Sequence, residues 1–127
     1  MTEPGWLTVE LVIAFHDRQL KEFGGPPGIR DLGMLESALD RPKNKWAYEG
    51  AKLPDLAASY AYGIARNHPF VDGNKRAALL ASVIFLDLNG IDFDVSETEF
   101  AAIILALAAG EISEESLGQW FKDNLPK

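Results

Sequence analysis

HPFVDGNKR, the stretch from His68 to Arg76, is followed directly by an apolar run from Ala77 to Leu86. Proline lacks an N–H and disfavours the helical conformation in the residue before it. Pro69 therefore predicts that one helix ends near Asn67 and that His68 is extended. The glycine supplies backbone freedom for a close turn, and the good helix formers after it predict that a second helix begins within a residue or two.

The residue types in this stretch favour a phosphate site at the start of the second helix. The first N–H groups of a helix have no partners within it, and the macrodipole adds partial positive charge, so an anion is stabilised there. Lys75 and Arg76 add two cations, and Asp72 supplies a carboxylate suited to Mg²⁺. His68 is suited to proton transfer. Each residue alone also fits a structural turn with solvated charges, but such a turn does not need the whole set in this order.

HPFVDGNKR resembles the signature of the Fic/Doc family, and the lysine after Asn74 is typical of its Doc (death-on-curing) branch. The resemblance extends along the chain through His16-Asp17, Gly24-Gly25 with Pro27-Gly28, Asn89-Gly90, and the segment from Gly110 to Ser113. It implies a compact Fic/Doc helical fold and the toxin of a type II toxin–antitoxin system.

Carried over to this chain, the resemblance makes His68 the general base and Asp72 the Mg²⁺ ligand. Arg66 becomes a second cation for charge that develops in the transition state. Phe70 matches the aromatic residue of the signature, and we interpret it as a core anchor for the loop. Contacts with the phosphates of ATP are assigned to the four residues Gly73, Asn74, Lys75 and Arg76.

The identity of the transferred group depends on two positions. Classical Fic enzymes have glycine in place of Lys75 and transfer AMP; the Doc branch is taken to reverse the nucleotide and transfer the γ-phosphate. AMP-transferring members also carry a second arginine where this chain has Leu79. The resemblance therefore implies a protein kinase acting on a Ser or Thr hydroxyl of elongation factor Tu, the known Doc target. AMP transfer and a noncatalytic antitoxin-binding module remain alternatives, and Leu80 replaces a residue that is polar in Doc.

Length and composition limit the class of protein. A chain of 127 residues predicts one domain, over residues 1–127, with a normal core. It has no cysteine and two histidines, which excludes disulfides and a His/Cys zinc site. The formal charge of −7 argues against binding to nucleic acid. Neither a membrane span nor a signal peptide is indicated, so we expect a cytoplasmic protein.

Capping residues and apolar spacing predict an all-α bundle of about six helices. The central helix is expected after the signature, because that run is apolar on nearly every side. His16 falls on the apolar face of the first helix, which favours a hydrogen-bonded core histidine over a catalytic one. The expected helices run from Thr8 to Phe23, from Asp31 to before Pro42, from Pro54 to Asn67, from the signature to Leu86, from Ser96 to Gly110, and from Ser113 onward.

Between Arg41 and Leu53 the apolar pattern lapses, which predicts a mobile flap over the site. Trp46 and Tyr48 are then candidates for contact with the target protein, or alternatively pack at the edge of the core. Family resemblance also implies an antitoxin whose disordered segment folds onto the toxin. Fic inhibitory helices carry Ser/Thr-x-x-x-Glu-Gly/Asn, but Glu49-Gly50 has Lys45 at the Ser/Thr position. Inhibition in trans is therefore expected.

Overall fold

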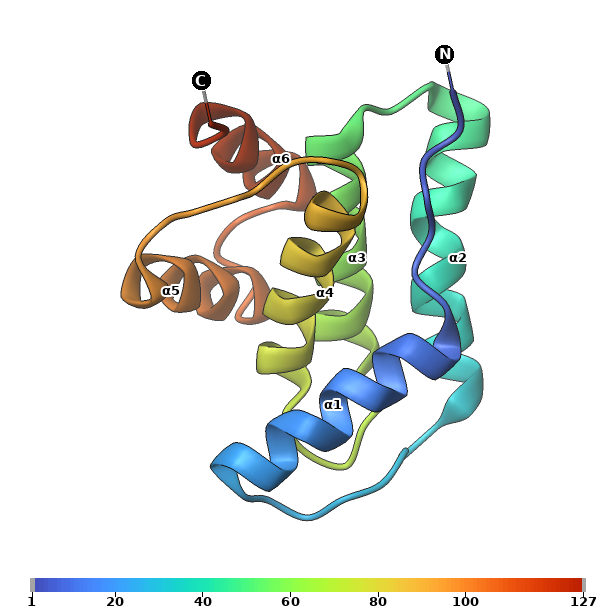
Figure 1. Cartoon of the computed structure of the whole chain (residues 1–127), viewed down its shortest axis with the longest axis vertical. Coiled ribbons are helices and arrows are strands. Elements are labelled where there is room, and N and C mark those ends of the chain that lie inside the picture. Colours follow the sequence, from blue (N-terminus) through green and yellow to red (C-terminus); the bar gives the residue numbers. More distant parts are fainter. Residues whose placement is uncertain (1, 127) are drawn as a thin grey trace.

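The computed structural model describes residues 2–126 and contains six α-helices in that range (Figure 1). The all-α bundle predicted from the sequence is confirmed. The prediction of one domain over 1–127 includes two residues, Met1 and Lys127, that lie outside the described range. In chain order the helices are α1 (Val9–Phe23), α2 (Leu32–Glu49), α3 (Leu53–Asn67), α4 (Asn74–Leu88), α5 (Glu97–Ala108) and α6 (Glu114–Asp123).

All four N-caps predicted at helix starts are present in the structure. In each case the side-chain oxygen accepts a hydrogen bond from the backbone N–H three residues later, at 3.0–3.1 Å. Pro54 lies in the first turn of α3, where its missing N–H costs nothing. These starts are local in origin, which explains why the sequence predicts them. The four caps are Thr8, Asp31, Ser96 and Ser113.

The central helix is α3, so the expectation that the helix after the signature is central was wrong. Ten of the fifteen residues of α3 are buried, and it packs against α2, α4, α5 and α6. Alanines and one glycine on several sides of α3 let the neighbouring helices approach closely. A search for large apolar residues therefore does not identify α3 as the central helix. Among residues 2–126, no helix is long and apolar enough to cross a membrane.

The second helix is longer than predicted, because α2 passes through Pro42 and ends at Glu49. Proline removes the N–H that would bond to the carbonyl of Ala38 four residues earlier. At this point α2 lies close to Gly63 of α3: a Cβ there would come within 3.1 Å of the Ala38 Cα and 3.2 Å of its carbonyl oxygen. Pro42 itself is buried. Packing against α3 therefore holds the helix together where the local sequence predicts a stop.

The flap predicted between Arg41 and Leu53 is contradicted, since residues 41–49 are helical. The C-terminal end of α2 and the turn between α3 and α4 lie at opposite ends of α3 (Figure 1). A 15-residue helix spans roughly 22 Å, so this segment does not cover the turn. Trp46 is half-buried against Trp6, with ring centroids 6.2 Å apart, whereas Tyr48 is 86% exposed. Trp46 thus packs at the core edge.

The two ends of the described chain lie on the same side of the bundle, near the start of α3 (Figure 1). The N-terminal segment runs along α2, and Gly5 exchanges two hydrogen bonds with the side chain of Asn89. α6 packs against α3 and places the C-terminal end nearby. The turn between α3 and α4 is at the far side, where α1 crosses the bundle.

Candidate active site

His68 has a left-handed backbone conformation, with φ 49° and ψ 55°, so the expectation that it is extended was wrong. Within residues 2–126 it is the one non-glycine residue with positive φ. The conformation avoids the right-handed helical region disfavoured before Pro69, while the His68 N–H still caps α3 by donating to Ile64 at 3.2 Å. A strained backbone at an exposed histidine is a feature typical of functional sites.

Side chains of α1 contact the buried side of the turn. His16 is 1% exposed, and its ring stacks on Phe70 with centroids 3.7 Å apart. Its Nε2 lies 2.8 Å from the carbonyl oxygen of Asp72, and Gln19 Nε2 donates to the carbonyl of Gly73 at 3.4 Å. The predictions of a hydrogen-bonded core histidine and of Phe70 as a core anchor are both confirmed.

The segment before α2 holds the other side of the turn. The N–H of Val71 donates to Gly28, and the N–H groups of Arg30 and Asp31 donate to Pro69, over 2.7–3.1 Å. The Arg30 guanidinium also donates to the carbonyl of His68 at 2.6 Å and to that of Asn67 at 2.7 Å. The loop of residues 24–30 therefore lies against the turn. The segment between Arg41 and Leu53, which was predicted to be the flap, does not.

Asn74 ties the start of α4 back to the turn. Its side chain accepts from the N–H of Phe70 at 2.9 Å and donates to the Phe70 carbonyl at 3.0 Å, so the amide faces the core. Because its side-chain amide is hydrogen-bonded to Phe70, Asn74 can contact a ligand only through its main chain. Within residues 2–126, the N–H groups from Gly73 to Arg76 have no protein acceptor. Four donors at one helix start are suited to bind an anion.

A depression of about 270 Å³ opens over these donors. It is lined by His68, Val71, Asp72, Gly73, Asn74, Lys75 and Arg76. His68 and Lys75 also line a neighbouring depression of about 530 Å³, whose other wall is the alanine-rich face of α5 and the turn after it. The structure thus brings imidazole, carboxylate, amide donors and two cations around one open volume.

The two arginines proposed for the site, Arg76 inside the signature and Arg66 before it, differ in position. Arg76 lines the depression; its guanidinium lies 3.8 Å above the ring of Phe23 and 3.6 Å from the carboxylate of Glu97. Arg66 is not among the lining residues. Its guanidinium lies 5.6 Å from the ring centroid of Tyr62, and Gly110 is close to it. A role for Arg66 at the reacting phosphate remains a prediction.

A family model described as the Fic/DOC family matches residues 6–86, which include α1, α2, α3, the turn and most of α4. The chain belongs to the Fic/Doc family. It is similar to "Protein kinase doc" of Escherichia phage P1, with 38% identity over 113 residues, 87% of this chain and 88% of that protein. It is also similar to "Toxin Doc" of Mycolicibacterium smegmatis, with 43% identity over 83 residues, 61% of this chain and 64% of that protein. These relatives place it in the Doc branch.

The donor set of this Fic/Doc site fits magnesium only together with a phosphate ligand. Among residues 2–126, no group of three or more His, Cys, Asp or Glu side chains is arranged to hold a metal ion. Asp72 is exposed and is the one carboxylate lining the depression. Magnesium commonly binds through one or two carboxylates, with water and phosphate oxygens completing its shell. Asp72 beside the free N–H groups fits this arrangement.

The sequence did not predict two side chains that contact the turn between α3 and α4. These are Gln19 and Arg30. Gln19 follows His16 by three residues, so both fall on one helix face, and this spacing was an available signal. Arg30 lies in an irregular loop, and nothing in its local sequence shows that it contacts residues 37 and 38 positions later. Such contacts depend on how the loop folds across the end of α3.

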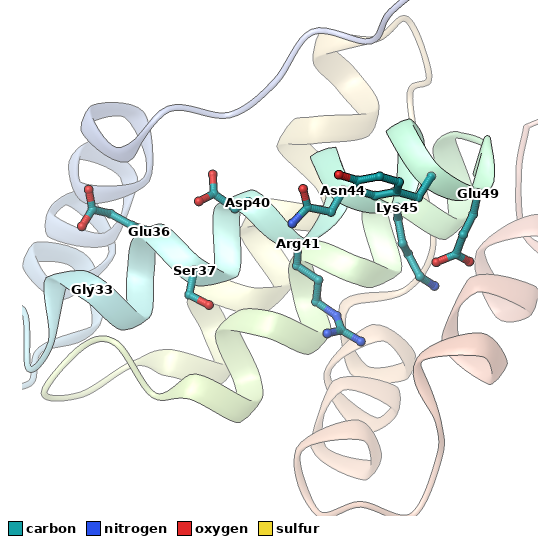
Figure 2. A pocket seen from close by; sticks show the side chains of 9 residues that line it. Gly33, Glu36, Ser37, Asp40, Arg41, Asn44, Lys45 and Glu49 are labelled. Atoms are coloured by element: carbon teal, nitrogen blue, oxygen red, sulfur yellow. The ribbon is translucent and has the colours of Figure 1, made fainter.

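A larger depression, of about 620 Å³, lies along the outer face of α2 and includes no residue of the Fic/Doc turn (Figure 2). Arg41 and Lys45 line it, and both side chains extend toward α6, where they pair with the buried carboxylate of Glu114. Burial alone would raise the pKa of Glu114, but the hydrogen bond and charge of Arg41, with those of Lys45, lower it below the usual value. This cluster joins two helices.

Proposed function

We propose that this Doc-branch protein is a toxin that transfers the γ-phosphate of ATP to a Ser or Thr hydroxyl of a translation factor, with elongation factor Tu as the leading target. The target places the reaction in the cytoplasm. The observation that supports the proposal is the convergence of His68 and Asp72 on the free N–H groups that follow Gly73.

In this proposal His68 accepts the proton of the attacking hydroxyl, whose oxygen bonds to the γ-phosphorus. The bond between that phosphorus and the β–γ bridging oxygen breaks, and ADP leaves. Its side chain is exposed at the edge of the depression, so a hydroxyl from another protein can reach it. The N–H groups from Gly73 to Arg76 and the side chains of Lys75 and Arg76 bind the phosphate oxygens. Asp72 would hold magnesium, whose positive charge would neutralise those oxygens.

The loop of residues 24–30 aligns the target segment in this proposal, in place of the segment around Tyr48. Its backbone already pairs with the turn through Gly28 and Arg30, and Ile29 forms an isolated antiparallel bridge with Phe70. Gly25 lies against the metal-binding carboxylate: a Cβ there would come within 2.5 Å of Asp72 Oδ2. A side chain at this position would therefore disturb the site directly.

Phosphate transfer and AMP transfer are separated by labelling. Only AMP transfer leaves α-label on the target, and only phosphate transfer leaves γ-label. Lys75, which lines both depressions, and Leu79, where AMP-transferring members have arginine, favour the phosphate reaction. We expect γ-label on elongation factor Tu and a lower rate for Lys75→Gly. Incorporation of α-label, or an undiminished rate for the variant, would overturn the assignment.

An antitoxin that acts in trans is the proposed partner. Glu49 and Gly50 lie at the end of α2 opposite the turn, so they do not provide an inhibitory glutamate in cis. Growth should stop when the chain is expressed alone and resume when a neighbouring reading frame is expressed with it. Calorimetry tests the alternative of a noncatalytic module, which predicts no ATP binding with or without Mg²⁺.

A further inference from the structure

Two buried side chains of α1, His16 and Gln19, contact main-chain carbonyls of the turn and take no part in the reaction proposed above. We propose that His16 is a positioning residue, assisted by Gln19, which aims the anion-binding N–H groups of the turn at the phosphate. This inference rests on the proposed function for the identity of the ligand. The orientation of the N–H groups is independent of it.

The contact of His16 with Asp72 has a defined direction. The carbonyl oxygen of Asp72 only accepts hydrogen bonds, so the ring nitrogen 2.8 Å away, Nε2, carries the proton and donates it. Stacking on Phe70 at 3.7 Å, with an interplanar angle of 11°, and nearly complete burial leave the ring little freedom to turn. The Asp72 carbonyl is therefore held toward α1.

The geometry of the peptide bond carries this constraint to the ligand side. The carbonyl of Asp72 and the N–H of Gly73 belong to one planar trans peptide, in which the two groups point in opposite directions. Holding the carbonyl toward α1 directs the Gly73 N–H away from α1. No residue of α1 lines the 270 Å³ depression. His16 thus fixes the first donor of the anion site without touching the ligand.

Gln19 acts in the same way one peptide later. The carbonyl of Gly73 accepts from Gln19 Nε2 at 3.4 Å and from the N–H of Ala77 at 2.9 Å, which orients the N–H of Asn74. The contact is close, because a Cβ on Gly73 would collide with Gln19 Nε2 and lie 3.5 Å from His16 Nε2. α1 therefore packs directly against this part of the turn.

The packing of Gln19 is costly for a purely structural residue. Its Oε1 is buried and has no partner among the described residues, and an unpaired buried amide oxygen destabilises a fold. An apolar side chain of similar size avoids that cost. If Gln19 serves packing alone, Gln19→Leu should raise the stability of the fold and leave ligand affinity unchanged. If Gln19 is a positioning residue, the same substitution should lower ligand affinity even though the fold becomes more stable.

The test combines three variants with a matched control. His16→Phe keeps a flat ring on Phe70 and removes the donor, His16→Gln restores a donor without the ring, and Gln19→Leu removes the amide. Tyr60→Phe is the control. The hydroxyl of Tyr60, in the middle of α3, accepts a buried hydrogen bond from the main-chain N–H of Leu7, and the substitution removes that bond. Each protein is measured by thermal unfolding, by the amide ¹H–¹⁵N shifts of Gly73 and Asn74 without ligand, and by calorimetric titration with ATP and Mg²⁺.

We expect the Gly73 amide to shift in His16→Phe and to stay near its original position in Tyr60→Phe. ATP affinity should fall about tenfold in His16→Phe, the effect of one hydrogen bond, and less in His16→Gln. Gln19→Leu should unfold at an equal or higher temperature and still bind ATP more weakly. An unchanged Gly73 amide in His16→Phe, or an unchanged Asn74 amide in Gln19→Leu, would overturn the inference.

The outcomes separate this inference from the proposed function. If the unmodified protein does not bind ATP, the proposed function fails, while the amide shifts of the ligand-free proteins still decide whether α1 orients the turn. If His16→Phe does not fold, His16→Gln and Gln19→Leu still give the amide and affinity results. Weaker binding with unchanged amides would also count against positioning through the peptide plane.

Discussion

Two regions of the molecule bury polar side chains, and they use them differently. At the α3–α4 turn, His16 and Gln19 hold main-chain carbonyls, while the side chains of His68 and Asp72 remain exposed. Between α2 and α6, Glu114 is 4% exposed and is paired with side chains that belong to the bundle. The first region leaves groups available to a ligand, and the second satisfies its charges internally. Mutations in the two regions should therefore separate activity from stability.

The largest expected effect is on activity at the turn. His68→Asn should lower phosphate transfer by about 10²–10⁴-fold, because the general base is lost. Stability should hardly change, since asparagine tolerates the left-handed conformation found at this position. Incorporation of γ-label and thermal unfolding measure the two quantities. Transfer at the original rate would refute the assignment of the base.

At the ion-pair cluster the expected effect is on stability. Glu114→Gln should lower the free energy of unfolding by about 1–3 kcal/mol, because the positive charges of Arg41 and Lys45 lose their partner. Arg41 is partly exposed, which limits the loss. Urea unfolding measures it, with Glu115→Gln as the control, since this exposed neighbour in the same helix turn loses the same charge. Equal effects at both positions would contradict the importance of burial.

A smaller effect is a pH dependence confined to the same cluster. The folded-state pKa of Glu114 is lowered from the usual 4.5, so its contribution to stability is present above pH 4.5 and is lost as the pH falls through the folded-state value. The stability difference between the original protein and Glu114→Gln should shrink in acid. Unfolding curves from pH 6 downward test this, and a constant difference would argue against the ion pair.

The smallest effect is expected at Tyr48. Because this side chain is 86% exposed and lies at the opposite end of α3 from the turn, Tyr48→Ala should change stability by less than about 0.5 kcal/mol and leave transfer unchanged. Gly25→Ala is the contrasting variant, since its Cβ would meet the carboxylate of Asp72. A transfer defect in Tyr48→Ala with none in Gly25→Ala would restore the original flap assignment.

Features of local origin could be predicted from the sequence. The N-caps at Thr8, Ser96 and Ser113 depend on residues within one turn, and so does the helix start after Gly73. The grouping of His68, Asp72 and Lys75 was also predictable, because a short turn between two helices keeps these residues close together.

Features that depend on tertiary packing were missed. Pro42 has the local properties of a helix stop, yet contact between Ala38 and Gly63 supports α2 beyond it, and the flap was misplaced as a result. Arg30 holds the carbonyl of His68 across 38 positions, and no periodic pattern links them. The left-handed conformation of His68 occurs together with its cap on α3 and with this contact.

Both ends of the described chain lie on the side of the bundle away from the α3–α4 turn. A fluorescent protein or a surface tether fused at either end would therefore leave the proposed active site unobstructed. Immobilised in this way, the molecule should still admit the proposed target, a translation factor, so that single-molecule capture of the encounter becomes practical from either terminus.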